Sequence, residues 1–316
     1  ATAATDAGVS TNTAYLGLEI DQAHEGPGLR IAGVLPRGPA DQPGKKIAPG
    51  EYVLAVDGQD VRYSEDLFKI LRDKVGTQVE LLVNVRPEKP GARTVQIRGA
   101  SRAEVENLEY ERWVAERRER VDRLSGGALA YIHIRAMDRP SLERFQRELF
   151  GDAQSKRGLV LDVRYNPGGR IHDELLGILT RRAHAYETPR DSERSTQPFQ
   201  MWGRPIVLLI NEFSASDAEI FPNGFRFFGL GPIVGVPTAG AVIGTSDITL
   251  VDGTRFRVPA TGWETADGKP LENVGVAPDV MVEMSPEDLA TDNDRQLAEA
   301  VRLLLEKLSQ TAPGPG

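Results

Sequence analysis

The sequence of 316 residues contains no cysteine. This absence excludes disulfide bonds, catalysis by a thiolate and metal sites built on cysteine. The chain also lacks a cluster of histidines, a glycine-rich phosphate loop and a Walker lysine, so we expect neither a metal nor a nucleotide cofactor. Both reducing and oxidising compartments tolerate a chain without cysteine. We expect a cytoplasmic protein, with an exported or periplasmic one as the alternative.

Long hydrophobic runs are missing as well. No apolar stretch approaches the ~20 residues that a membrane-spanning helix needs, which predicts a soluble globular protein. The first ten residues contain no methionine, basic segment or apolar core, so no signal peptide is expected; a processed or excised chain has the same appearance. The formal net charge of −8 argues against nucleic acid as the main partner.

What the chain does contain is enough residues for about two domains. After an N-terminal extension of residues 1–14, residues 15–98 consist of short β-rich runs that glycine and proline turns interrupt. One helical stretch, Ser64 to Lys74, lies among these runs. We expect a small β-sheet domain with a single helix.

The order of these runs resembles a PDZ domain of the bacterial, protease-attached type. The segments that carry the resemblance are GPA at 38–40 and IAPGEYVLAVDGQDV at 47–61. In that family one loop offers backbone N–H groups to the terminal carboxylate of a peptide, which adds to the sheet as a strand. The corresponding residues here are Tyr15, Leu16, Gly17 and Leu18. The alternative is that this domain only packs on its neighbour and gates access.

Residues 99–127 are predicted to form a connecting helix. The stretch 101–127 is strongly charged, contains no proline and ends in two glycines, while a thin apolar stripe runs along it. Its arginines are interleaved with glutamates, which cancel the positive field. A mostly solvated helix between two domains is therefore a better interpretation than a nucleic-acid-binding patch.

From residue 128 to residue 316 strands and helices alternate. Near-continuous apolar strands are predicted at 128–134, 158–165, 205–211 and 232–237, which implies an α/β layer structure with a covered sheet. A β-rich region follows at 247–280. An amphipathic helix over 286–308 closes the chain.

Two motifs stand at the ends of predicted strands, DVRYNPGG at 162–169 and NEFSASDAEIF at 211–221. The carboxyl ends of parallel strands gather on one edge, so the two motifs could share a crevice. Gly168 and Gly169 would let backbone N–H groups approach a reacting carbonyl, and the N–H of Asp217 would add a second donor beside Ser216. The alternatives are a plain turn at the glycines and a helix cap at Ser216 or Asp217.

The segments RYNPGG, NEFSASDAEIFPNGF, GPIVGVPTAG and LENVGVAPD follow one another after the PDZ-like domain. In this order they resemble the core of the tricorn proteases, which belong with the tail-specific, or carboxy-terminal processing, serine peptidases. The resemblance implies an α/β layered peptidase core of the Clp/crotonase-like type that acts on peptides or unfolded segments. We also expect a homo-oligomer.

The resemblance assigns roles to four residues of this sequence. The serine that corresponds to Ser216 is the nucleophile of the superfamily. The N–H groups of Asp217 and of a glycine that we place at Gly168 bind the oxyanion, and the glutamate that corresponds to Glu272 orients the base.

Members of the superfamily activate the serine in two ways. Tail-specific peptidases use a buried, deprotonated lysine about 25 residues beyond the nucleophile. The corresponding position here is Ala241, and Lys269 and Lys307 are the only lysines that follow Ser216. A serine–lysine dyad is therefore not expected. The tricorn branch instead uses a histidine, with the glutamate behind it.

The position of that histidine is an open question. In tricorn proteases it lies in a Ser-His segment upstream of the PDZ domain, and this sequence has no histidine before Tyr15. Its four histidines are His24, His133, His172 and His184.

Three explanations remain. The base belongs to an upstream segment or domain of the same protein that is absent here, or it is another histidine, of which His172 is the nearest, or the chain is a non-catalytic PDZ peptide-binding scaffold. We adopt the first and expect residues 1–316 alone to be inactive. A crotonase-like enzyme acting on thioesters would need an adenine–pantetheine site that the sequence does not show.

Overall fold

The computed structural model describes residues 12–62, 64–191 and 193–310, so residues 1–11 of the N-terminal extension lie outside the described residues. The chain divides into two compact units, with the boundary between Ala115 and Glu116. That boundary falls inside helix α2 (Arg102–Ser125), which lies where the sequence predicts the connecting helix. The glycines at 126 and 127, both in the left-handed region, end this helix.

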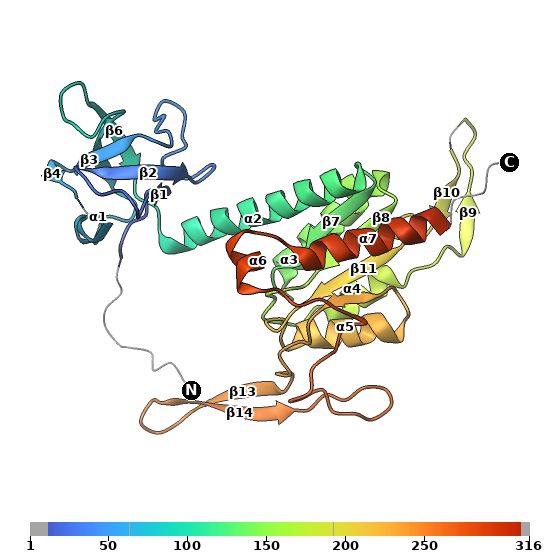
Figure 1. The fold of residues 1–316 in the computed structure, drawn as a ribbon. Coiled ribbons are helices and arrows are strands. Elements are labelled where there is room, and N and C mark those ends of the chain that lie inside the picture. The colour runs from blue at the N-terminus through green and yellow to red at the C-terminus, as the bar shows by residue number, and fades with distance from the viewer. Residues whose placement is uncertain (1–11, 63, 192, 311–316) are drawn as a thin grey trace. The chain divides into compact units, whose positions relative to one another are not determined.

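Within its described residues, the first unit contains an antiparallel sheet of six strands (Figure 1). Strands β1 (Leu18–Ile20), β2 (Leu29–Val34), β3 (Tyr52–Val56), β5 (Gln78–Asn84) and β6 (Arg93–Arg98) are adjacent in this order, and β4 (Gln59–Asp60) pairs with β3. In β5, buried Val79, Leu81 and Val83 alternate with more exposed residues, as expected of a half-buried strand.

The helix of this unit, α1 (Ser64–Ile70), is shorter than predicted. Its N–H···O pattern reaches Leu71, which donates to the carbonyl of Leu67. Asp73 then takes a φ of 60°, which a helix cannot accommodate. The prediction of a helix up to Lys74 was therefore wrong at its C-terminal end.

The second unit is built on a parallel sheet (Figure 1). Its strands are adjacent in the order β15 (Val280–Met281), β12 (Ile233–Gly235), β11 (Ile206–Ile210), β8 (Gly158–Asp162) and β7 (Leu129–His133). Every residue of β7, β8 and β11 is buried, which requires both faces of the sheet to be covered.

Helices cover this sheet. Helices α3 (Arg139–Phe150), α4 (His172–Leu179) and α5 (Asp217–Phe227) share one apolar core with alternate strand residues such as Leu159 and Leu161. Helix α7 (Arg295–Gln310) contacts β8, β11 and β12. A side chain built on Gly158, which precedes Leu159, would contact Leu304 of α7, so α7 packs on the opposite face. A short helix, η1 (Asp152–Ser155), follows α3.

The closing helix differs from its prediction, because it is divided into α6 (Pro286–Ala290) and α7. Between them Asp292 has a φ of 51°, and the carboxylate of Asp294 accepts the N–H of Leu297 at 2.9 Å, as a helix N-cap does. The predicted continuous helix over 286–308 was therefore wrong. No helix in the described residues is long and apolar enough to cross a membrane.

Two hairpins extend from the second unit. Strands β9 (Ala185–Glu187) and β10 (Ser195–Gln197) form one, and β13 (Gly244–Thr249) and β14 (Arg255–Thr261) form the other. The latter begins slightly before the predicted β-rich region at 247–280. Figure 1 shows both as two-stranded ribbons.

Candidate active site

Ser216 lies in a tight elbow between β11 and α5. Its φ of 56° and ψ of −119° are uncommon for a residue with a side chain, and such strain is a signal of a functional position. Its backbone N–H donates to the carbonyl oxygen of Ala241 at 3.0 Å and to the Glu219 carboxylate at 3.1 Å. The elbow is therefore held from two directions.

The two predicted motifs are adjacent in the structure. The N–H of Ala215 donates to the carbonyl of Asn166 at 3.0 Å. A Cβ atom on Gly168 would lie 2.6 Å from the Cβ of Ser216, and one on Gly169 would lie 2.0 Å from the carbonyl oxygen of Met137. Only glycine fits at both positions; Gly168 packs directly against the elbow, and Gly169 packs against Met137.

The backbone N–H groups near Ser216 are not equally free. The N–H of Gly168 donates to the side-chain oxygen of Asn166 at 2.9 Å, which argues against our placement of the oxyanion donor at Gly168. Gly169 forms a parallel bridge with Met137: the N–H of Met137 donates to the carbonyl of Gly168, and the N–H of Arg170 donates to the carbonyl of Met137. In such a bridge the N–H of the middle residue, Gly169, points away from Met137. The N–H of Asp217, the first residue of α5, has no acceptor within its helix.

The buried side chain of Asp217 binds the start of helix α4. One carboxylate oxygen accepts the N–H of Ile171 at 2.7 Å and that of His172 at 3.2 Å, and the other contacts the His172 ring at Nδ1. This hydrogen bond raises the pKa of His172. The ring also packs edge-on against Trp263, and its Nε2 lies 3.4 Å from the carboxylate of Asp173.

Glu272 lies beside the segment that holds the elbow. Its Oε2 accepts the N–H groups of Val242 at 2.7 Å and Ile243 at 2.8 Å. These two residues follow Ala241, whose carbonyl binds Ser216. The sequence-predicted residues Ser216, Asp217 and Glu272 thus belong to one connected region.

Sequence reasoning missed Glu219. This fully buried carboxylate accepts hydrogen bonds from the Thr238 hydroxyl at 2.6 Å and from the N–H groups of Gly240 at 2.7 Å, Ala241 at 2.8 Å and Ser216. It therefore ties α5 to the 238–241 loop. The available signal was the Ser-x-x-Glu spacing of a capping box.

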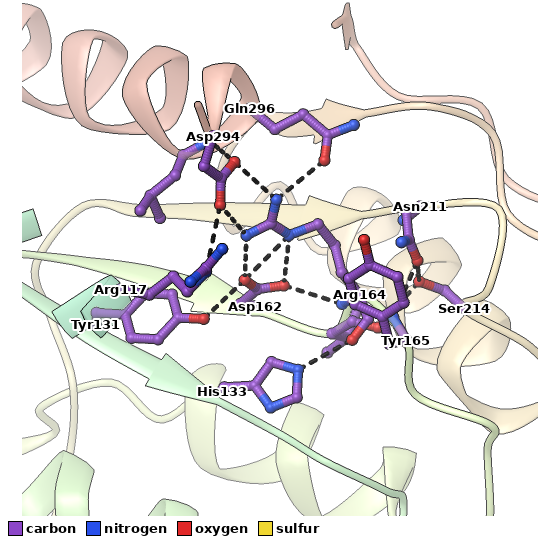
Figure 2. Close-up of polar contacts among 12 residues, drawn as sticks. Arg117, Tyr131, His133, Asp162, Arg164, Tyr165, Asn211, Ser214, Asp294 and Gln296 are labelled. Carbon is purple, nitrogen blue, oxygen red and sulfur yellow. Dashed lines mark hydrogen bonds and ion pairs between the residues drawn. The ribbon is translucent and has the colours of Figure 1, made fainter. Parts of the chain in front are cut away.

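A buried polar network joins the DVRY motif, residues 162–165, to the start of α7 (Figure 2). The guanidinium of Arg164 donates to the carboxylates of Asp162 and Asp294, with shortest distances of 2.7 and 2.9 Å. Tyr131 donates its hydroxyl hydrogen to Asp162 at 2.9 Å. Burial disfavours the charged guanidinium, but the two carboxylates outweigh it and raise the pKa of Arg164. The motif is thereby attached to the N-terminus of α7.

The remaining histidines have other surroundings. His133 is buried, its Nε2 lies 2.9 Å from the carbonyl oxygen of Arg164, and burial lowers its pKa. His24 lies in the first unit, where its ring contacts that of Tyr52. His184 donates its N–H to the carbonyl of Gln197 in the β9–β10 hairpin. In the part of the chain that the structure describes, no three histidine, aspartate or glutamate side chains are grouped as a metal site.

The predicted peptide loop lines a pocket in the first unit. The pocket has a volume of about 230 Å³, and Tyr15, Leu16, Gly17 and Leu18 form one wall. Leu67 of α1 and Leu71, which directly follows this helix, line it as well. Strand β1 is at the edge of the sheet, so a further strand could pair with it.

Comparisons with known proteins identify both units. Residues 16–100 match the family model of the tricorn protease PDZ domain, and residues 128–282 match peptidase family S41. Tricorn protease homolog 1 of Streptomyces coelicolor is 36% identical over 317 residues, which cover 96% of this chain and 29% of that protein. Tricorn protease of Thermoplasma acidophilum is 32% identical over 265 residues, which cover 83% of this chain and 24% of that protein.

The fold agrees with these sequence matches. The crystal structure of the tricorn protease superposes with a TM-score of 0.82 at 27% identity, over 94% of this chain and 29% of that one. The chain spans less than a third of the length of these relatives. The predicted resemblance and fold class are confirmed. This chain belongs to peptidase family S41, in the branch of the tricorn proteases.

Proposed function

We propose that this chain carries the nucleophile of a tricorn-type serine peptidase that hydrolyses peptides or unfolded polypeptide segments through an acyl-enzyme on Ser216. The observation that carries the proposal is the position of Ser216. It occupies an elbow with positive φ at the N-terminus of α5, with Gly168 packed against it. Backbone N–H groups at such a place stabilise developing negative charge.

In the proposed reaction the Ser216 hydroxyl oxygen bonds to the carbonyl carbon of the scissile peptide, and its proton passes to a histidine base. The resulting oxyanion accepts hydrogen bonds from the N–H groups of Asp217 and, in place of Gly168, Gly169. Collapse of this intermediate expels the amine, which takes the proton back, and leaves an ester on Ser216. Water then cleaves the ester with the same base.

We infer that the base comes from a segment upstream of this chain. Nε2 of His172, the ring nitrogen that Asp217 leaves free, lies 3.4 Å from the carboxylate of Asp173, which supports a role other than proton transfer from Ser216. Glu272 binds backbone N–H groups through Oε2 alone. Within the described residues its Oε1 has no hydrogen-bond partner, which supports its role in orienting an incoming imidazole.

The test compares residues 1–316 with the complete product of the reading frame that encodes them. We expect peptide turnover only from the complete protein, with loss of turnover in Ser216→Ala and a ~10²–10⁴-fold lower kcat in Glu272→Gln. A fluorophosphonate should label Ser216. Strong turnover by residues 1–316 that His172→Ala abolishes would identify an internal base, and no turnover by the complete protein would favour the scaffold.

For the first unit we propose capture of peptide C-termini at Tyr15 to Leu18. The pocket and the free edge of β1 support this role. A fluorescence titration should show tighter binding of a peptide with a free C-terminus than of its amidated form, because the N–H donors need a carboxylate. Equal affinities would favour the packing role.

We also propose that the protein is a homo-oligomer and is cytoplasmic, with export as the alternative location. The β13–β14 hairpin exposes large apolar side chains, among them Ile248 and Phe256, and a two-stranded hairpin is marginally stable by itself. A second copy could cover it. Sedimentation equilibrium of the complete protein tests the assembly, and fractionation of the cells tests the location.

A further inference from the structure

The side chain of Asp217 makes contacts that the reaction outlined above does not use. We propose that this carboxylate is a positioning group that clamps the glycine-pair loop, residues 168–172, against the nucleophile elbow and so sets the distance between the two oxyanion donors. The inference rests on the proposed function, because it concerns how the site that contains Ser216 is built.

The geometry of the clamp is direct. The Asp217 side chain is only 3% exposed and binds the loop through the N–H of Ile171 at 2.7 Å, the N–H of His172 at 3.2 Å and the His172 ring. Ile171 is two residues beyond Gly169, so the contact lies within about 7 Å of that residue along the chain. Asp217 therefore carries one proposed oxyanion donor on its backbone and holds the segment of the other with its side chain.

The loop is held on its other side by Met137, which lies between β7 and α3. The N–H of Met137 donates to Gly168 at 3.0 Å, and the N–H of Arg170 donates to Met137 at 2.7 Å. The Met137 bridge fixes the loop relative to the segment between β7 and α3, whereas the Asp217 side chain fixes residues 171–172 relative to α5. Without the carboxylate, the loop would keep its bridge to Met137 and the contact of Gly168 with Ser216, but residues 171–172 would lose their attachment to α5.

A buried carboxylate this close to an oxyanion has an electrostatic cost, because two like charges a few ångströms apart in a site of low dielectric repel each other. A protonated His172 offsets that cost. Its ring is bound to Asp217 of α5, and Asp173 and Glu174 of its own helix also favour the charged form. Trp263 packs against the ring and carries no charge. The pair Asp217–His172 is thus neutral while the imidazole is protonated.

The first test is the rate at which a fluorophosphonate labels Ser216 in the complete protein, together with kcat and KM. We expect Asp217→Ala, which removes the oxygen that accepts both loop N–H groups, to lower the labelling rate and kcat by about 10²-fold, the scale of a lost oxyanion donor, with KM changed less than about threefold. The matched control is Glu212→Gln, an exposed carboxylate between β11 and Ser216 that binds no loop N–H; it should stay within about twofold of the wild type.

The second test is the pH dependence, which a merely structural role would not change. The wild-type kcat should fall at alkaline pH as His172 loses its proton, and this fall should be absent in His172→Gln. The His172 pKa, followed by NMR, should drop in Asp217→Ala. His172→Gln also serves if Asp217→Ala does not fold.

The outcomes separate the two proposals. If the wild type is labelled and Asp217→Ala is labelled at the same rate, the clamp is wrong and the proposed function stands. If His172→Gln retains the alkaline fall, the charge compensation by His172 is wrong. If the wild type itself is not labelled at Ser216, the proposed function fails.

Discussion

The backbone N–H of Ser216 donates a hydrogen bond to the carbonyl oxygen of Ala241 over 3.0 Å. Ala241 stands where the sequence of a tail-specific peptidase would have its lysine base. The structure therefore places this position in contact with the proposed nucleophile, and the residue there has no group that could accept a proton. The segment that would carry a lysine base therefore lies beside Ser216, but its side chain at this position is the methyl group of alanine.

The first prediction follows from that contact. Replacing Lys269 and Lys307 by alanine, separately and together, should leave kcat of the complete protein within about twofold and its pH profile unchanged. Lys269 is exposed in a turn and pairs with Asp267, and Lys307 is exposed in α7. Steady-state kinetics over a pH series measures this. A drop of more than tenfold in either variant would reinstate a lysine mechanism.

The second prediction separates the two serines of the motif. Ser214 is fully buried, donates to the carbonyl of Val163 at 2.9 Å and accepts the N–H of Asn211 at 3.1 Å. Ser214→Ala should lower the free energy of unfolding by ~1–3 kcal/mol, because two buried groups lose a partner. Labelling of Ser216 per folded molecule should be unchanged. Urea denaturation and labelling stoichiometry give the two numbers, and lost labelling in stable Ser214→Ala would reverse the assignment.

The third prediction concerns Glu219. An amide at this position offers one acceptor oxygen and directs its NH₂ group at other donors, so Glu219→Gln should cost about 3 kcal/mol or more of unfolding free energy. Glu212→Gln is the matched control, since Glu212 is exposed on the same elbow and should change stability by less than about 0.5 kcal/mol. Equal stabilities of the two variants in urea would contradict the structural role of the buried carboxylate.

The fourth prediction is a pH dependence of stability. Burial disfavours the charged carboxylate of Asp294, but Arg164 outweighs burial and lowers its pKa. Because the pKa of Asp294 is lower in the folded protein than in the unfolded chain, the ionised carboxylate stabilises the folded state. This stabilisation is complete above the unfolded-state pKa of about 4, and it is lost as the pH falls through the folded-state pKa.

The measurement is urea denaturation between pH 3 and pH 7. At neutral pH, Asp294→Asn should cost ~3–5 kcal/mol, because Arg164 loses a buried partner. The loss of stability on acidification should be smaller in the variant than in the wild type. Parallel acid profiles for the two proteins would show that Asp294 does not contribute to acid unfolding.

Local sequence was sufficient for much of this protein. Alternating and continuous apolar runs identify the two sheets because the side-chain period of a strand is a local property. The motif around Ser216 and the glycine pair could likewise be located by pattern, since a tight elbow and a close backbone approach restrict the residue types that fit. Ser216 and Asp217 were selected as candidates in this way, whereas Glu272 was proposed only from the resemblance to the tricorn proteases.

Only the tertiary structure decided which backbone N–H groups and side chains near the site are already hydrogen-bonded and which are available. Whether Gly168 or Gly169 has an available N–H depends on the side chain of Asn166 and on the bridge to Met137, which no periodicity encodes. The break before α7 depends on Asp292 and Asp294, and Asp294 also binds Arg164, 130 residues away in the sequence. Hydrogen-bond partners are chosen by distance in space once the sheet has formed, so a buried donor or acceptor is assigned only when its distant neighbours are known.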